Sequence, residues 1–382
     1  MDRDLFTEDH ETYRKTVRAF IGREVAPGYE QWEERGLVPR GVWRTAGRQG
    51  IIGLSVPERL GGAGEPDYRY RVVVAEEMAA AGAASLSAGI GVQDDIVIPY
   101  LAELGTESQH DRWLPGLASG ELIGAIAMTE PEAGSDLRSI RTRAVRGGAG
   151  WVLSGQKTFI SNGIHADTVI VAARTDPDGG ALGFSLFVVE RDDPGFRRGR
   201  RLAKLGLRAQ DTAELFFDEV RLPADRLLGT AGRGLVQLRE RLPLERLSVA
   251  VQALASATAV HRATTEHCFE RRAFGRTIGD FQHTRFVLAE MATELDVTRA
   301  YLDRAVLAHN SGALSAVDAA KAKWWTTELH TQVVDRCLQL HGGMGYMTEH
   351  PVARAFVDAR VQTIYAGTTE IMKEIIGRDL AP

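Results

Sequence analysis

The spacing of hydrophobic and polar positions changes twice along the chain and divides it into three stretches. In residues 1–120 apolar positions recur with a helical period. One predicted helix stops at Pro27, and its apolar face is formed by Tyr13, Val17, Phe20, Ile21 and Val25. An alanine-rich helix is predicted over 72–81, and the glycine-rich link 57–66 before it predicts a turn. We therefore expect an N-terminal helical domain.

Residues 121–228 have a different pattern, in which short β-type runs alternate with turn residues. The clearest runs are 151–153, 168–171, 184–189 and 215–217. Glycine, proline and aspartate separate them, as at 177–180. This spacing favours a compact middle domain built as an antiparallel β-barrel or sandwich.

Residues 229–382 return to a helical period, and no proline occurs between Pro243 and Pro351. One helix is predicted to end at 310–312, and Ser315 with Asp318 resembles a capping box that opens the next helix. The stripe of the first of these helices is Leu288, Met291, Leu295, Leu302 and Val306. The pattern predicts an antiparallel four-helix bundle. The fold class is therefore α+β, in the order helix, β, helix.

Charge and composition exclude several classes of protein. The 382 residues include 46 basic and 51 acidic side chains, a net charge of −5, which is unlike a nucleic-acid-binding protein. No run of about 18 apolar residues predicts a membrane helix, and Met1 to His10 lacks the apolar core of a signal peptide. Cys268 and Cys337 have no metal-type spacing, so we expect packed thiols, no metal site and a cytoplasmic location.

Motifs of several common enzyme classes are missing from the sequence. It has no phosphate loop, no strand-linked Gly-x-Gly-x-x-Gly, no paired zinc histidines and no Gly-x-Ser-x-Gly. Kinase, nicotinamide-enzyme, zinc-protease and serine-hydrolase functions are therefore unsupported. The glycines after His341 are better explained by a helix end followed by a turn.

Four segments resemble signatures of the acyl-CoA dehydrogenase family and occur in the family's order. They are 127–136, 156–163, 271–282, and the combination of 339–343 with 364–371. Two further segments, 205–217 and 244–247, are similar to the long-chain branch of that family. The resemblance implies an FAD-dependent enzyme of fatty acid metabolism that oxidises an acyl thioester to the enoyl thioester.

The resemblance also implies where FAD binds. The flavin ring is expected against Ile126, Met128, Thr129, Phe159, Ile160 and Ser161, with Thr368 and Glu370 at its other edge and Ser135 near the pyrophosphate. The hydroxyls of Thr129 and Ser161 can hydrogen-bond the ring and tune its acceptance of hydride. Without the other motifs, residues 161–163 would be explained better by a hairpin turn than by flavin binding.

A second group of residues is implied to bind the adenosine-diphosphate half of FAD across a subunit boundary. These residues are Arg271, Phe274, Gln282, Gln339, Leu340, Gly342 and Gly343. We therefore expect a homo-oligomer, most simply a tetramer built as a dimer of dimers. The alternatives are a surface arginine at Arg271 and a simple helix cap at Gly342 and Gly343.

The catalytic base is expected at an unusual position. Most family members carry a glutamate where this chain has Ala366, whereas the long-chain and isovaleryl branches supply it from the position of Glu245. We expect Glu245 to begin a helix, with Glu240 as its rival, and a solvated first-turn glutamate as the alternative. Burial would raise its pKa toward that of the substrate α-proton. Ser135, Arg246 and Ala366 are the expected substrate contacts, the last through its backbone N–H.

Several functional points stay open at the level of sequence. The alternatives are an oxygen-using flavin oxidase, an enzyme acting on an acyl-carrier protein in natural-product biosynthesis, and a flavin-binding homologue without turnover. For a dehydrogenase, electron-transfer flavoprotein is the implied acceptor. Chain length and the oxidised carbon pair are not specified. Asp94 and Asp95 suit a hydrocarbon pocket poorly, and we expect at least one to face solvent.

Overall fold

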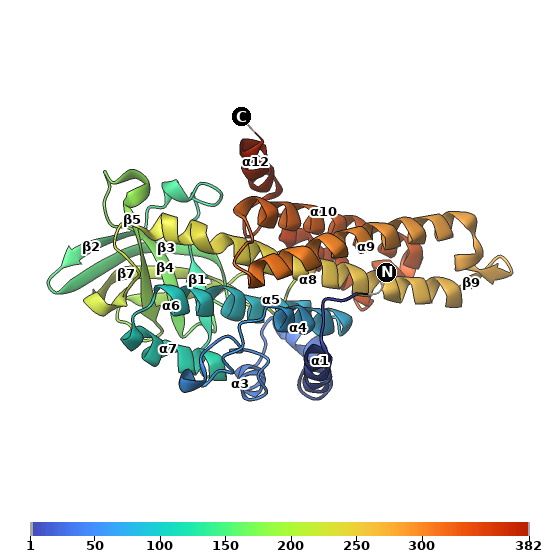
Figure 1. Cartoon of the computed structure of the whole chain (residues 1–382), viewed down its shortest axis with the longest axis horizontal. Coiled ribbons are helices and arrows are strands. Elements are labelled where there is room, and N and C mark those ends of the chain that lie inside the picture. Colours follow the sequence, from blue (N-terminus) through green and yellow to red (C-terminus); the bar gives the residue numbers. More distant parts are fainter. Residues whose placement is uncertain (1–2, 381–382) are drawn as a thin grey trace.

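Helices, a β-sheet and a second group of helices follow one another along the chain, in the order that the sequence predicts (Figure 1). The computed structural model describes residues 3–380. Outside this range lie Met1, Asp2, Ala381 and Pro382. The first two belong to the segment Met1 to His10, for which no signal peptide is expected. Among the described helices, none has a stretch long and apolar enough to span a bilayer.

The N-terminal unit is entirely helical. Its helices are α1 (Glu8–Phe20), α2 (Tyr29–Arg35), α3 (Arg40–Arg48), α4 (Arg69–Ala80), α5 (Ala84–Gly91), α6 (Ile98–Leu104) and α7 (Glu107–Ser119). A π-helical turn, Val92–Val97, joins α5 directly to α6. The predicted apolar face of α1 is buried at Val17 and Phe20, as its period indicates.

The middle unit is an eight-stranded mixed sheet with strand order β6-β7-β3-β2-β4-β5-β8, and β1 pairs with β4. Its strands are β1 (Gly124–Ala127), β2 (Arg143–Gly147), β3 (Gly150–Ser161), β4 (Thr168–Arg174), β5 (Phe184–Glu190), β6 (Phe196–Arg201), β7 (Thr212–Pro223) and β8 (Leu227–Leu228). Most strand pairs are antiparallel, as predicted, but the sheet is mixed, because β2 pairs with β4 in parallel and β1 also lies parallel to β4. The β2–β3 hairpin lies between them in sequence and gives the chain the length for that crossover.

The C-terminal unit is built on three long helices, α8 (Gly234–Glu270), α9 (Gln282–Asn310) and α10 (Ala316–His341). The shorter helices α11 (Pro351–Ala359) and α12 (Thr369–Asp379) pack against α10. Ser315 caps α10 by accepting a hydrogen bond from the Asp318 backbone, as predicted. The predicted stripe of α9 is buried in a core shared with α8 and α10.

Helix α8 contradicts one expectation from the sequence. It continues through Pro243, so Glu245 lies inside the helix rather than at its start. The proline removes only the hydrogen bond to the Arg239 carbonyl, and the packing of the remaining helix outweighs that loss. Figure 1 shows α8 running from the sheet to the far end of the bundle, where strands β9 (Arg272–Ala273) and β10 (Arg276–Thr277) form a small hairpin.

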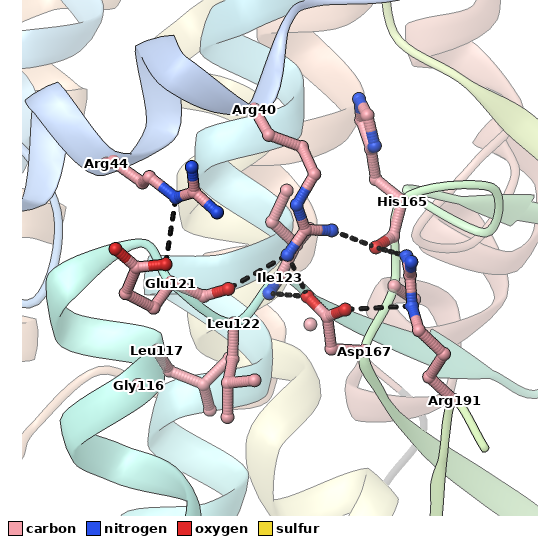
Figure 2. A network of polar contacts seen from close by, with 12 residues as sticks. Arg40, Arg44, Gly116, Leu117, Glu121, Leu122, Ile123, His165, Asp167 and Arg191 are labelled. Carbon is pink, nitrogen blue, oxygen red and sulfur yellow. Dashed lines mark hydrogen bonds and ion pairs between the residues drawn. The ribbon is translucent and has the colours of Figure 1, made fainter.

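A polar network joins the N-terminal helices to the sheet (Figure 2). Arg40 on α3 donates hydrogen bonds to the backbone carbonyls of Glu121 and His165 and to the Asp167 carboxylate. Asp167 also pairs with Arg191 at 2.9 Å and accepts a hydrogen bond from the Ile123 backbone N–H. One carboxylate therefore receives donors from three segments and fixes how the two units meet.

Candidate active site

Glu245 is buried, with 3% of its surface exposed, on the side of α8 that faces the N-terminal helices. Its carboxylate oxygen Oε1 accepts a hydrogen bond of 2.9 Å from the hydroxyl of Tyr100 on α6. The other oxygen, Oε2, has no hydrogen-bond partner within residues 3–380. The rival, Glu240, is solvent exposed. Of the two glutamates, only Glu245 lies in a water-poor environment.

Burial raises the pKa of Glu245 to about 7, while the Tyr100 hydrogen bond and the charge of Arg246 lower it in part. A carboxylate with such a pKa holds a proton near neutral pH more readily than an ordinary glutamate does. It is therefore better matched to a weakly acidic carbon acid.

The loop that contains Ala366 lies close to the same stretch of α8. Ala366 and Gly367 both have left-handed backbone conformations, with φ of +52° and +94°. A Cβ placed on Gly367 would lie 3.9 Å from a guanidinium nitrogen of Arg246. Lys323 on α10 holds the loop by donating to the Gly367 carbonyl at 2.7 Å. The structure thus places the Ala366 loop beside Arg246, which follows Glu245 on α8.

Two groups around this loop have unused hydrogen-bonding capacity within the described residues. The backbone N–H of Ala366 donates no hydrogen bond there. Arg246 is buried, and its Nε has no partner. Two free donors next to a buried carboxylate can bind a carbonyl oxygen and stabilise negative charge that develops on it.

The residues expected to hold the flavin ring form a platform where the end of β3 meets the segment that follows β1. The Thr158 backbone N–H donates to the Thr129 carbonyl at 2.9 Å, which places the two segments side by side. Phe159 has φ of +59°, and 66% of its surface is exposed. The side-chain hydroxyls of Thr129 and Ser161 make no hydrogen bond to the described residues.

An open aromatic surface flanked by two free hydroxyls fits a flavin ring, which needs an apolar support and donors at its edge. Ile126 and Met128 are half-buried beside it. Ile160, in contrast, points into the core of the sheet, so only its backbone can reach a ligand. Ser135 lies in an exposed turn, while half-buried Thr368 caps α12, where Glu370 occupies the exposed first turn.

The second predicted group gathers elsewhere, at the far end of the bundle. These residues lie at the end of α8, in the β9–β10 hairpin, at the start of α9 and at the end of α10: Arg271, Phe274, Gln282, Gln339, Leu340, Gly342 and Gly343. Phe274 is 94% exposed. Because α8 rises 1.5 Å per residue, Arg271 lies roughly 40 Å along the helix from Glu245. The second group therefore lies at the other end of α8 from the proposed base, and its role across a subunit boundary stays a prediction.

Asp94 and Asp95 were expected to include a solvent-facing acid, and that expectation was wrong. Both are buried, with 8% and 4% of their surfaces exposed. Arg71, on α4, pairs with Asp95 at 2.9 Å and with Asp94 at 3.3 Å. Asp95 also accepts a hydrogen bond of 2.6 Å from Ser248 on α8. The single charge of Arg71 is shared by two carboxylates, and burial raises the pKa of Asp94 to about 6. No pattern in the sequence links the three residues.

A cavity of about 430 Å³ continues along the same face of α8 toward the end of the bundle. Its α8 wall is formed by Gln252, Ser256, Ala259, Val260 and Ala263, which share a helical face with Glu245. Small residues of α4 and α5 form the opposite wall: Ala79, Ala80, Ala84, Ser87 and Ala88. Tyr100 was missed from the sequence because it lies in no family motif, and the cavity was missed because residues from distant segments form its walls.

Family models match nearly the whole chain. Acyl-CoA dehydrogenase N-terminal, middle and C-terminal domain models match residues 7–121, 125–220 and 232–381. The long-chain specific acyl-CoA dehydrogenase from Sus scrofa mitochondria is 45% identical over 380 residues, which cover 99% of this chain and 88% of that protein.

Solved structures show the same similarity. An acyl-CoA dehydrogenase from Geobacillus kaustophilus superposes with a TM-score of 0.97 at 46% identity and covers 100% of both chains. A glutaryl-CoA dehydrogenase from Mycobacterium smegmatis, in complex with FADH2, has a TM-score of 0.92 at 29% identity and covers 99% of this chain and 95% of its own.

Proposed function

The chain belongs to the acyl-CoA dehydrogenase family, whose members are FAD flavoproteins that convert acyl-CoA to enoyl-CoA, and we propose that Glu245 is the base of this reaction. The observation that carries the proposal is the buried Glu245 carboxylate, whose pKa is raised to about 7 beside the Ala366 loop. When bound, FAD accepts the hydride that leaves the substrate β-carbon.

The protein side chains and backbone would perform the remaining work. Glu245 removes the α-proton of the thioester through its free Oε2. The Ala366 N–H is available to the thioester oxygen, where negative charge develops, and Arg246 adds positive charge nearby. Ala366 has no carboxylate, so the loop cannot supply a base and leaves space on its side of the α-carbon. The reaction needs only one base, and Glu245 supplies it from α8.

We further propose that the acyl tail occupies the cavity along α8. Its volume of about 430 Å³ lies within the range of ligand pockets, roughly 300–1,000 Å³. Its walls near α4 and α5 are mainly alanine, which suits a hydrocarbon chain, whereas ionisable residues such as His267, Arg354 and Asp358 line other parts of it. The long-chain enzyme at 45% identity is consistent with a tail of considerable length.

Assembly, location and redox partner are also proposals. A homotetramer is supported by the exposed apolar side chains at the bundle end, among them Phe274, Met344 and Tyr346. Two buried, unpaired cysteines suit the reducing cytoplasm. Electron-transfer flavoprotein is the proposed acceptor, on the basis of the family resemblance.

The central experiment measures anaerobic bleaching of the FAD-loaded protein. We expect a panel of acyl-CoA thioesters to reduce the flavin, and electron-transfer flavoprotein to reoxidise it faster than air does. An arm with acyl-carrier-protein thioesters tests the biosynthetic alternative. Rapid reoxidation by oxygen would instead favour an oxidase. If no thioester bleaches the flavin, the proposal that Glu245 serves as a catalytic base is wrong.

A further inference from the structure

Tyr100 contacts Glu245 from a different structural unit. It lies on α6, just after the π-helical turn Val92–Val97, and none of its surface is exposed. Its hydroxyl is 2.9 Å from Glu245 Oε1, whereas the nearest alternative acceptor, the Leu238 carbonyl, lies at the 3.5 Å limit of a hydrogen bond. The hydroxyl is therefore committed to the glutamate.

The direction of this hydrogen bond follows from the charges around it. Burial and the nearby charge of Glu245 raise the pKa of Tyr100 well above its ordinary value. The phenol thus stays protonated and donates to the carboxylate. Glu245 Oε2 has no partner among residues 3–380, so it is the oxygen that remains free to take a proton.

We propose that Tyr100 is a positioning residue for the base: it holds Glu245 Oε1, leaves Oε2 facing the substrate α-carbon, and stabilises the ionised carboxylate. This inference rests on the proposed role of Glu245. In the step itself the α-carbon–hydrogen bond breaks, the proton forms an O–H bond with Oε2, and the electron pair remains on the thioester. Tyr100 keeps its own proton throughout.

The charged groups near the pair are few, so the effect of removing the hydroxyl can be predicted. Arg246 is adjacent to Glu245 on α8 and lowers its pKa. Arg241, also on α8, lies near Tyr100 and forms an ion pair with Glu103 on α6. Tyr100→Phe leaves all three charges in place and removes only the hydrogen bond. The pKa of Glu245 must then rise further, because burial is opposed by one fewer interaction.

The same interface provides a matched control. Ser248, also on α8, donates its hydroxyl to Asp95 at 2.6 Å and forms no hydrogen bond with the Glu245 side chain. Ser248→Ala therefore removes one buried hydroxyl between the same two units without changing the partner of the base. A general loosening of the interface would affect both variants, whereas loss of positioning would affect only Tyr100→Phe.

The experiment follows anaerobic flavin reduction by an acyl-CoA against pH in the wild type, Tyr100→Phe, Ser248→Ala and Glu245→Gln. For Tyr100→Phe we expect the midpoint of the pH profile to move upward by about one pH unit, the size expected for losing a hydrogen bond to a charged group. The plateau at high pH should fall on the order of tenfold, because Oε2 is no longer oriented. Ser248→Ala should keep the wild-type midpoint.

A second measurement needs no turnover. The infrared carboxyl band that disappears in Glu245→Gln reports the ionisation of Glu245 directly, and its midpoint should rise in Tyr100→Phe. An unchanged midpoint in both measurements would overturn the positioning role while leaving Glu245 as the base. If the flavin of Glu245→Gln is instead reduced at the wild-type rate, Glu245 is not the base. The positioning role then fails with it, and an infrared shift in Tyr100→Phe would show only that the hydrogen bond exists.

Discussion

At the scale of single residues, the environment of Glu245 explains why this position can supply a base. The sequence predicted the residue through its family motif, but it could not indicate Tyr100, which lies 145 positions earlier in the chain. A hydrogen bond between residues so distant in sequence leaves no local pattern. The same holds for Arg71, whose pairing with Asp94 and Asp95 corrected the expectation of a solvent-facing acid.

The first prediction concerns Glu245→Gln. Glutamine keeps the size of the side chain and can still accept the Tyr100 hydrogen bond, but it cannot take the α-proton. We expect FAD to remain bound and flavin reduction to slow by at least about 10²-fold, the low end for a lost general base. Stopped-flow absorbance measures this rate.

Two further variants make that result specific. Glu240→Gln alters an exposed side chain of the same helix and should leave the rate near that of the wild type. Ala366→Glu in the Glu245→Gln background should restore part of the rate, because the Ala366 loop lies beside the same stretch of α8. A wild-type rate in Glu245→Gln would assign the base to another residue.

The second prediction concerns the pH dependence of the wild type. The active form of the base is the carboxylate, and burial raises the pKa of Glu245 to about 7. The rate of flavin reduction should therefore rise as pH increases through about 7 and level off above it. A flat wild-type profile from acid to neutral pH would contradict the assignment.

At the scale of elements, α8 links the proposed base to the cavity. Strongly periodic elements such as α1, α9 and the strands β3, β4, β5 and β7 were predicted correctly from hydrophobic spacing. The short or arginine-rich strands β1, β2, β6 and β8 were missed, because their sequences carry no clear alternation. The start of α8 was predicted too late in the chain, just after Pro243. Proline usually breaks a helix, and the sequence does not show the tertiary packing that keeps this helix continuous.

The third prediction tests the cavity through Ala259, a half-buried residue of its α8 wall. Ala259→Phe places a ring in empty space rather than in a packed core, so the fold should tolerate it. We expect flavin reduction by long-chain acyl-CoA to fall on the order of tenfold, with little change for butyryl-CoA. The short substrate is the internal control. An equal loss at every chain length would exclude the cavity as the tail site.

At the scale of the whole molecule, the Asp167 network determines how the N-terminal helices meet the sheet (Figure 2).

The fourth prediction is that Asp167→Asn lowers the free energy of unfolding by roughly 2–4 kcal/mol, because Arg40 and Arg191 both lose a largely buried counter-charge. Denaturant titration measures the change. Glu121→Gln is the matched control: its pair with Arg44 is exposed, so its loss should cost less than about 1 kcal/mol. Equal losses in the two variants would contradict a special role for Asp167.

The last prediction concerns assembly, because the flavin platform at Phe159 and the group around Arg271 belong to different units of the chain, the sheet and the far end of the bundle. If Arg271 completes a neighbour's FAD site, Arg271→Ala should lose FAD and activity, while Glu245→Gln should keep FAD and lose activity. Coexpression of the two variants should then restore activity. In a mixed pair, the Arg271→Ala chain supplies Glu245 and receives Arg271 from its partner, so one of the two sites is complete. With random pairing about a quarter of the sites should be active, as reciprocal two-fold contacts require.

Mixing the separately purified, assembled variants provides the control and should restore no activity until subunits exchange. If coexpression restores no activity, Arg271 and Glu245 serve the same chain's site or Arg271 does not contact FAD, and the proposed reciprocal assembly is wrong.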